Sequence, residues 1–327
     1  MANYTITQAI SEYLDTVRLA RSENTARTYR NALSYFLSVL ENHDYPPKKS
    51  LVNDFTEDPI NWLAAALKDC APTTERLYLS AASGFYRYLA AEGLATINLP
   101  RLELLIRQRA RRPGHRLPQF ERDSIEKTID YAINLAQLTT TRKVDRLRAL
   151  RDRSFILTLA DTGMRVHEVC SLRRGDLDWN EYKAVIIGKG DKQAVVRFSS
   201  RAISSLKDYL NTRTPLDGSS GRPLTALPIF ARHDRGAGKK VLPITTTTGR
   251  NIIRQRVLEA LGEDAVGTIT PHSFRHYFVT TVLKASSGNL KLAQELARHK
   301  NITITQRYAH LTDDELDHGY WEVFENG

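Results

Sequence analysis

Apolar residues recur at intervals of three and four over the first 95 residues of the chain. Residues spaced in this way lie on one face of an α-helix, so each run predicts a helix with one buried side. The predicted helices span residues 5–19, 25–40, 58–67 and 72–91, and Asp58 followed by Pro59 is a typical helix start. The inward side of the fourth helix is expected to hold Leu77, Ala81, Phe85, Tyr88 and Leu89. Residues 1–95 are therefore predicted to form an all-helical domain.

Residues 96–116 interrupt this periodicity and are rich in arginine and proline. Arg109, Arg111 and Arg112 stand together near the end of the segment, just before Pro113. Such a stretch predicts a basic linker that can lie along phosphate groups, and a nuclear-localisation signal is the alternative. The chain is thus divided into residues 1–95, a linker over 96–116 and a second domain over 117–327.

The second domain begins with helical patterns over 120–138 and 143–159, and the sequence assigns no role to this segment near 120–150. Two short β-branched runs, 182–187 and 194–198, flank a Gly-Lys-Gly-Asp-Lys stretch and predict a hairpin. Residues 212–249 are expected to be irregular. Further helices are predicted over 250–261, 273–285, 290–297 and 303–309. The predicted fold is mainly α with a small β-sheet, of the α+β class in the second domain.

The charge balance suggests the kind of partner. The 327 residues include 47 Lys and Arg against 37 Asp and Glu, a formal net charge of +10, which favours a polyanion such as nucleic acid. Arg27 and Arg30 lie opposite the apolar stripe of the second helix, so their face is either solvated or DNA-binding. The two cysteines, Cys70 and Cys170, make a disulfide framework or thiolate zinc site improbable. With no signal peptide or membrane span recognisable, a cytoplasmic, nucleoid-associated protein is expected.

Candidate chemistry appears first in Thr-Gly-Met-Arg165, where a glycine break precedes a new helix. Glu168, three residues on, shares a helical face with Arg165 and can hold its guanidinium, although a surface ion pair would look the same. Lys189 lies at the predicted hairpin tip, where it can donate a proton, with Lys192 as the competing candidate.

His272, Arg275 and His276 form a His-x-x-Arg-His sequence, which brings an imidazole and a guanidinium onto one helical face. A capping role for His272 and a core position for His276 are the structural alternatives. His299 follows Arg298, and Tyr308 comes nine residues later in Thr-Gln-Arg-Tyr. Together these groups can clamp a phosphodiester, move protons and attack phosphorus without a metal ion or other cofactor.

These motifs resemble those of the tyrosine recombinase (phage integrase) family, of the simple Xer-like kind without an arm-site domain. The resemblance implies a helical, SAM-like core-binding domain and a catalytic domain that form a C-shaped clamp on DNA. It implies catalytic roles for six residues and supporting roles for Glu168 and His276. The six are Arg165, Lys189, His272, Arg275, His299 and Tyr308. Arg298 stands where the family usually has glycine.

The implied reaction is site-specific recombination through a 3′-phosphotyrosyl intermediate, for integration and excision or for dimer resolution. The implied partners are double-stranded recombination sites and three further copies, four protomers acting on two duplexes. A terminal amphipathic segment with Leu316, Tyr320, Trp321 and Phe324 is expected to dock on a neighbouring protomer or on its own domain. A type IB topoisomerase-like relaxation activity and a non-catalytic DNA-binding accessory protein are the alternatives.

Overall fold

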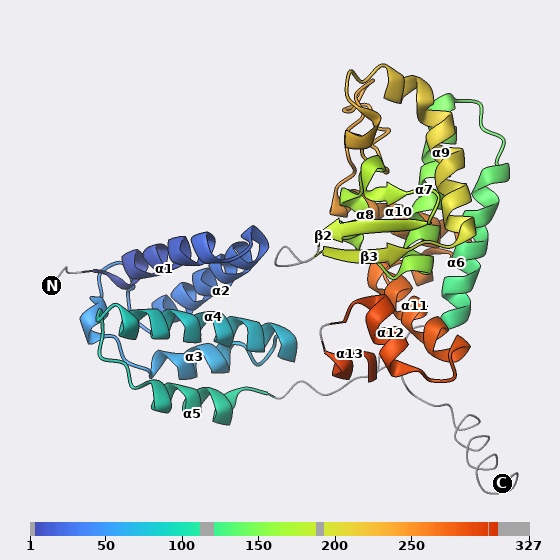
Figure 1. Cartoon of the computed structure of the whole chain (residues 1–327). Coiled ribbons are helices and arrows are strands. Elements are labelled where there is room, and N and C mark those ends of the chain that lie inside the picture. Colours follow the sequence, from blue (N-terminus) through green and yellow to red (C-terminus); the bar gives the residue numbers. More distant parts are fainter. Residues whose placement is uncertain (1–3, 112–120, 188–192, 300, 307–327) are drawn as a thin grey trace, which may run out of the picture. The chain divides into compact units, whose positions relative to one another are not determined.

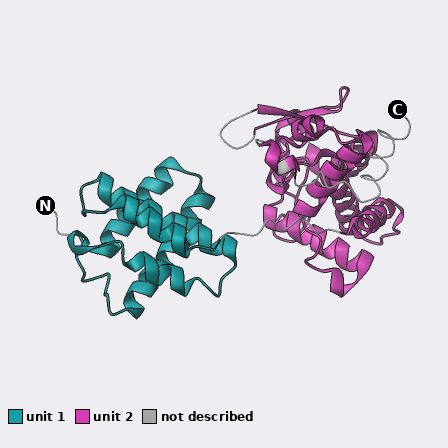
Figure 2. Ribbon diagram, turned by 90° about the horizontal axis from the view of Figure 1, so that it is seen from below, with its two compact units in different colours: residues 1–115 teal, residues 116–327 magenta. Residues whose placement is uncertain are grey.

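The computed structural model describes residues 4–111, 121–187, 193–299 and 301–306. The chain divides into two compact units between His115 and Arg116 (Figure 2). Its described elements are mostly α-helices with one three-stranded antiparallel sheet, which confirms the predicted fold class. Within these ranges, no helix combines the length and apolar character needed to cross a membrane.

The described part of unit 1 is helical (Figure 1). Its elements are α1 (Ile6–Ala20), α2 (Glu23–Asn42), η1 (Val52–Asp54), α3 (Pro59–Ala66), α4 (Pro72–Ala91) and α5 (Leu99–Arg109). Thr5 and Gln8 form a capping box that starts α1. The core is aromatic: Phe55 stacks on Tyr86 with ring centroids 5.2 Å apart, and Phe36 and Phe85 are buried beside them.

Two details of the predicted helices were wrong. Leu77 is 40% exposed and Tyr88 is only partly buried, whereas Tyr86 is fully buried beside Phe85, because its ring fills the space against Phe55. Asp58 does not cap α3, since its own backbone is helical at φ −58° and ψ −37°. Its carboxylate instead accepts a hydrogen bond from Arg101 Nη2 at 2.6 Å.

The segment expected to be a linker is partly helical, because α5 occupies residues 99–109. Asn98 caps this helix by accepting the Arg101 N–H at 3.0 Å, and Pro100 lies in the first turn, where a proline needs no hydrogen-bond donor. Leu102 is fully buried in the core of unit 1. Pro100, which suggested a break, therefore marks a helix start, and α5 belongs to the helical unit.

Glu75 of α4 fixes the chain just beyond α5. Its carboxylate is fully buried and accepts hydrogen bonds from the Arg111 backbone N–H at 3.0 Å, from Arg111 Nε at 2.5 Å and from Lys68 Nζ at 3.0 Å. Burial acts to raise the pKa of Glu75, but these bonds outweigh it, so that pKa lies below its ordinary value. Arg111 Nη2 also donates to the Cys70 carbonyl at 2.5 Å. The Arg111 guanidinium thus has an internal structural role.

Unit 2 has more elements around a larger core (Figure 1). Its first half holds α6 (Arg122–Asn134), η2 (Leu135–Gln137), α7 (Lys143–Thr162), α8 (Val166–Ser171), η3 (Arg174–Asp176), β1 (Leu177–Asp178), β2 (Lys183–Ile187) and β3 (Gln193–Arg197). Its second half holds α9 (Ser200–Gly218), η4 (Leu224–Ala226), α10 (Thr246–Leu261), η5 (Glu263–Ala265), α11 (Pro271–Ala285), α12 (Leu290–Ala297) and α13 (Ile302–Gln306). The central helix is α7, which packs against α6, α9 and α11.

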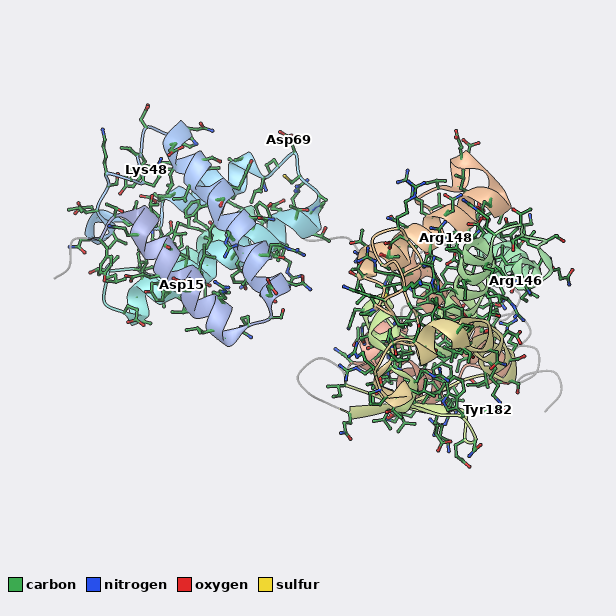
Figure 3. The ribbon with its side chains drawn as sticks, turned by 90° about the horizontal axis from the view of Figure 1, so that it is seen from above. Asp15, Lys48, Asp69, Arg146, Arg148 and Tyr182 are labelled. Carbon is green, nitrogen blue, oxygen red and sulfur yellow. The ribbon has the colours of Figure 1, made fainter. Side chains whose placement is uncertain are left out.

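The predicted hairpin is confirmed. β2 and β3 pair antiparallel, with Lys183 opposite Arg197 and Ile187 opposite Gln193. Tyr182, labelled in Figure 3, precedes β2 with φ 54°, and its carbonyl accepts the Phe198 N–H at 2.8 Å. Residues 188–192 between the strands, with Lys189 among them, lie outside the described residues.

The segment near 120–150 contributes to the core of unit 2. Ile125 and Ile129 of α6 are buried there. Arg146 and Arg148 extend from α7 (Figure 3), and they bond to the Ala136 carbonyl at 2.5 Å and the His233 carbonyl at 2.8 Å. This segment therefore helps to hold α7, the helix that leads to the first arginine motif.

Part of the expected irregular stretch 212–249 is helical, since α9 continues to Gly218 with Pro215 inside it. The physical reason is Arg213, which is fully buried and pairs with Asp217 at 2.8 Å, four residues on. Arg213 also donates to the carbonyls of Pro228 and Ile229, at 2.8 and 2.7 Å. A buried charge needs such partners. Asp217 lies four residues after Arg213 and can pair with it only if the helix continues that far.

The Glu75 contacts give a stability prediction. Glu75→Gln removes the counter-charge of Lys68 and Arg111, and we expect the free energy of unfolding to fall by about 1.5 kcal/mol. That is the low end for hydrogen bonds to a charged group, because both partners are more than a third exposed. Since the pKa is lowered by folding, the difference from wild type is full above the ordinary pKa of 4.5 and shrinks as pH falls below it.

Urea unfolding of the full chain followed by circular dichroism measures this loss. Glu103→Gln is the matched control, because Glu103 pairs with Arg87 at 2.9 Å on the surface, with both side chains mostly exposed. The control should change stability by less than about 0.5 kcal/mol. Equal effects of the two variants would contradict a structural role for Glu75.

Candidate active site

Arg165 is positioned by the end of α7 and the start of α8. α7 ends at Thr162 and is capped by Gly163, whose φ of 58° suits glycine, and a Cβ there would lie 2.4 Å from the Phe278 ring. Arg165 then caps α8: its N–H donates to Glu168 Oε2 at 2.8 Å and its Nη1 to Oε1 at 3.0 Å. The expected ion pair is present, and the Arg165 side chain is 46% exposed, so it can also reach a ligand.

Glu168 holds a second guanidinium, that of Arg298. Arg298 Nη2 lies 2.9 Å from Glu168 Oε2, across 130 residues of sequence. Burial acts to raise the pKa of Glu168, but Arg298 and Arg165 together bring it below its ordinary value. The carboxylate, only 3% exposed, is therefore ionised between two arginines.

Arg275 joins three helices at this place. Its side chain is buried, and its Nη1 and Nη2 donate to the carbonyls of Gly163 and Ala297, near the C-terminal ends of α7 and α12. Gly163 lies two residues before Arg165, and Ala297 lies two residues before His299. The single arginine of α11 therefore fixes the segments that carry two other candidate residues.

His272 and His276 lie one turn apart in α11, with ring centroids 4.2 Å apart and planes at 69°. Burial, then the charges of Arg275 and Arg165, hold the pKa of His272 below its ordinary value. Burial, then His272, Arg275 and His299, lower the pKa of His276 to about 4. Both imidazoles are therefore neutral at pH 7, and a neutral imidazole can accept a proton.

His299 lies in the turn between α12 and α13. Its Nδ1 is 2.9 Å from Thr305 Oγ1, and its backbone N–H donates to the Gln294 carbonyl at 3.0 Å. Burial, followed by the charges of Arg275 and Arg165, lowers the pKa of His299 to about 4. If Thr305 donates its hydroxyl proton to Nδ1, Nε2 carries the ring proton and can donate it.

The start of α13 differs by one residue from the helix predicted over 303–309. α13 begins at Ile302, and Asn301 Oδ1 accepts the Thr303 N–H at 3.1 Å. Asn301 therefore supplies the cap, since its short side chain reaches the N–H two residues on. Tyr308 and the terminal segment after it lie outside the described residues.

The structure brings together four of the six predicted catalytic residues, Arg165, His272, Arg275 and His299, with Glu168 and His276 beside them. Sequence reasoning treated Arg298 as a departure in a turn and missed Thr305 altogether. The sequence marked Arg298 only by the arginine that stands where the family usually has glycine, and it gave no signal for Thr305. Among the described residues, no group of three His, Cys, Asp or Glu side chains could hold a metal ion.

The predicted DNA-binding arginines have different surroundings. Arg27 and Arg30 are exposed on α2, and Arg109 is exposed at the end of α5. Arg111 is engaged by Glu75 and by carbonyls of its own unit, so the prediction that it contacts phosphate is not favoured by these contacts. Arg112 lies outside the described residues.

Two family profiles match this chain. The phage integrase family matches residues 131–315, which include every candidate catalytic residue. The N-terminal SAM-like domain of phage integrases matches residues 10–93.

Relatives of known identity span nearly the same length. The tyrosine recombinase XerC of Thermodesulfovibrio yellowstonii is 28% identical over 307 residues, which cover 92% of this chain and 91% of that protein. The XerC of Bacillus pumilus is 32% identical over 242 residues, covering 74% and 72%. The XerD of Oceanobacillus iheyensis is 26% identical, covering 95% and 96%.

Solved structures share the fold. The XerH recombinase bound to palindromic difH in a post-cleavage complex has a TM-score of 0.67 at 18% identity, covering 97% of this chain and 84% of that one. A lambda integrase dimer bound to a core site, residues 75–356, has a TM-score of 0.63 at 19% identity, covering 94% and 96%. The motifs, the fold and the family profiles agree, and the chain belongs to the phage integrase family as a Xer-like, site-specific tyrosine recombinase.

Proposed function

We propose that Arg165, Arg275, His272 and His299 form the centre in which Tyr308 cleaves and rejoins DNA. The observation that carries this proposal is that these four residues lie around the same helix ends. Arg275 bonds to the carbonyls of Gly163 and Ala297, and so holds the segments of Arg165 and His299 beside α11. Family membership does not favour the topoisomerase or accessory-protein alternatives.

In the proposed first step, the Tyr308 oxygen attacks phosphorus and gives its proton to His272. The two guanidinium groups stabilise charge on the non-bridging oxygens, and His299 donates a hydrogen bond to one of them. The bond to the 5′ oxygen breaks, and that oxygen takes a proton from Lys189. The products are a 3′-phosphotyrosyl bond and a free 5′ hydroxyl.

In the second step, a 5′ hydroxyl from a partner duplex attacks the phosphotyrosyl phosphorus and gives its proton to Lys189, which is neutral after the first step. The oxygen–phosphorus bond to Tyr308 breaks, and the tyrosine oxygen takes back its proton from His272. One phosphodiester is lost and one is formed, so the two steps balance without a nucleotide cofactor or metal ion. His276 supports this chemistry by packing against His272.

Unit 1 is proposed to bind the duplex as the SAM-like core-binding domain, with Arg27, Arg30 and Arg109 facing phosphates. Four protomers would act on two duplexes. XerH and lambda integrase were solved with DNA, which supports a duplex partner here. Such an enzyme would work on DNA in the cytoplasm, in integration and excision or in dimer resolution.

Replacing Tyr308 tests the nucleophile. Tyr308→Phe keeps the ring and removes only the attacking oxygen, so we expect normal DNA binding and no covalent adduct. The substrate is a nicked duplex carrying the site that the wild-type protein selects from a random-sequence pool, incubated in EDTA. Denaturing electrophoresis then reveals any adduct. Tyr320→Phe is the matched control and should form it, and an adduct with Tyr308→Phe would contradict the proposal.

The two arginines should differ when each is replaced. Arg165→Ala should lower single-turnover cleavage by about 10²–10³ with little change in melting temperature, because the side chain is half exposed. Arg275→Ala should lower cleavage to a similar extent and also destabilise the fold, because two helix-end carbonyls lose their donor. Cleavage and thermal unfolding, measured on each variant, separate these effects. Unchanged cleavage in Arg165→Ala would exclude it as a clamp.

The lowered histidine pKa values predict the pH dependence of cleavage. With the pKa of His276 and His299 at about 4 and that of His272 below its ordinary value, the neutral forms persist as pH falls. The ratio kcat/KM, which reports the free enzyme, should stay level from pH 8 to the ordinary histidine pKa of about 6.5 and decline only at more acid pH. A midpoint near the ordinary histidine pKa of about 6.5 would contradict neutral imidazoles. His167→Asn, an exposed neighbour, should leave the profile unchanged.

A further inference from the structure

Arg298 occupies a backbone position that favours glycine. It ends α12 with φ 56° and ψ 45°, in the left-handed region. A residue with a side chain is less stable there than glycine, because its Cβ crowds the neighbouring backbone. Such strain persists where the side chain makes an interaction that offsets it.

The Arg298 side chain makes that interaction in the candidate active site. It reaches from the end of α12 to α8, where Nη2 donates to Glu168 Oε2 at 2.9 Å. The side chain is only 12% exposed. Nη1 of Arg298 is buried and has no hydrogen-bond partner among the described residues.

Glu168 transmits this contact to Arg165. Its Oε2 accepts both the Arg165 backbone N–H and Arg298 Nη2, while its Oε1 accepts Arg165 Nη1. Two guanidinium groups and one carboxylate leave a local charge of about +1. Without Arg298, one guanidinium would face one carboxylate, and Arg165 would be drawn into a neutral pair with Glu168.

We infer that Arg298 is a positioning residue for Arg165. By holding one carboxylate oxygen of Glu168, it limits how far Glu168 can neutralise or pull back the Arg165 guanidinium, which stays available for the scissile phosphate. This inference rests on the proposed role of Arg165 in cleavage. Arg298 would then act together with Arg165 and Glu168, although it lies 130 residues from Glu168 in the sequence.

Three substitutions of Arg298 separate positioning from simple packing. Arg298→Gly removes the guanidinium and relieves the backbone strain, so the fold should keep its melting temperature. Single-turnover cleavage of the selected nicked duplex should fall by about tenfold to a hundredfold, as for a misplaced reacting group. Arg298→Met keeps the strain and the apolar stem and should lose as much. Arg298→Lys keeps a cation near Glu168 and should recover part of the rate.

The dissociation constant for the duplex, measured by gel shift, should change less than about threefold in all three variants. Arg142→Met is the matched control. Arg142 precedes α7 and lies about 30 Å along that 20-residue helix from Gly163, so its loss should leave cleavage unchanged. A wild-type rate in Arg298→Gly, or a loss of rate that only follows a loss of folding, would overturn the inference.

A double-mutant cycle with Glu168→Gln tests the route of the effect. If Arg298 acts through Glu168, adding Arg298→Met to Glu168→Gln should change the rate by less than about twofold. If Arg298 instead contacts the phosphate, the second substitution should cost a further factor of about 10²–10³, which would overturn the positioning role. The covalent adduct keeps the two proposals apart: a wild-type protein that forms none refutes the proposed function itself. A wild-type adduct with undiminished cleavage in Arg298→Gly refutes only this inference.

Discussion

One buried carboxylate makes the described site possible. Arg165 and Arg298 carry like charges that repel each other, and they share one place because the Glu168 carboxylate accepts hydrogen bonds from both. Arg275 is satisfied in another way, by carbonyls near the C-terminal ends of α7 and α12, which carry partial negative charge. At Arg275 the contacts that build the cationic centre also fix the helices, so this residue cannot be altered without changing the fold. Gly163 is needed for the same reason. Its carbonyl accepts a hydrogen bond from Arg275, and any side chain at this position would collide with the Phe278 ring.

The same positive field decides the state of the histidines. Burial is the larger cause of the lowered pKa of His272 and His299, and the charges of Arg275 and Arg165 add to it. A neutral His272 can take a proton, and a neutral His299 that accepts from Thr305 can still donate through Nε2. Replacing an arginine therefore changes two things at once, because it removes a proposed phosphate ligand and raises the proton affinity of the remaining imidazoles. Kinetic effects of such variants measure the centre as a unit rather than one contact.

Sequence patterns predicted the features that depend on residues close together in the chain. The spacing of apolar residues located most of the described helices, although not α5 or α9, and the β-branched runs located the hairpin, because each pattern matches the repeat of its element. The Arg165–Glu168 pair followed from three-residue helical spacing. The failures came from partners distant in sequence. Arg111 resembled a linker arginine because Glu75 lies 36 residues away. The end of α9 was expected to be irregular because the carbonyls that satisfy Arg213 belong to residues 228 and 229. The pair of Glu168 and Arg298 was invisible for the same reason.

A phosphodiester that entered this site would change the pKa of the histidines. Its negative charge would lie beside imidazoles whose pKa is lowered partly by arginines, and an opposite charge nearby raises a histidine pKa. His272 would begin as a base that takes the tyrosine proton, and it would hold that proton more firmly once phosphate is bound. The protonated imidazole can then return the proton to the tyrosine oxygen when the phosphotyrosyl bond is broken. A site that is cationic but has neutral histidines is therefore suited to a reaction that runs equally in both directions, because the substrate's own charge supports the change from base to acid.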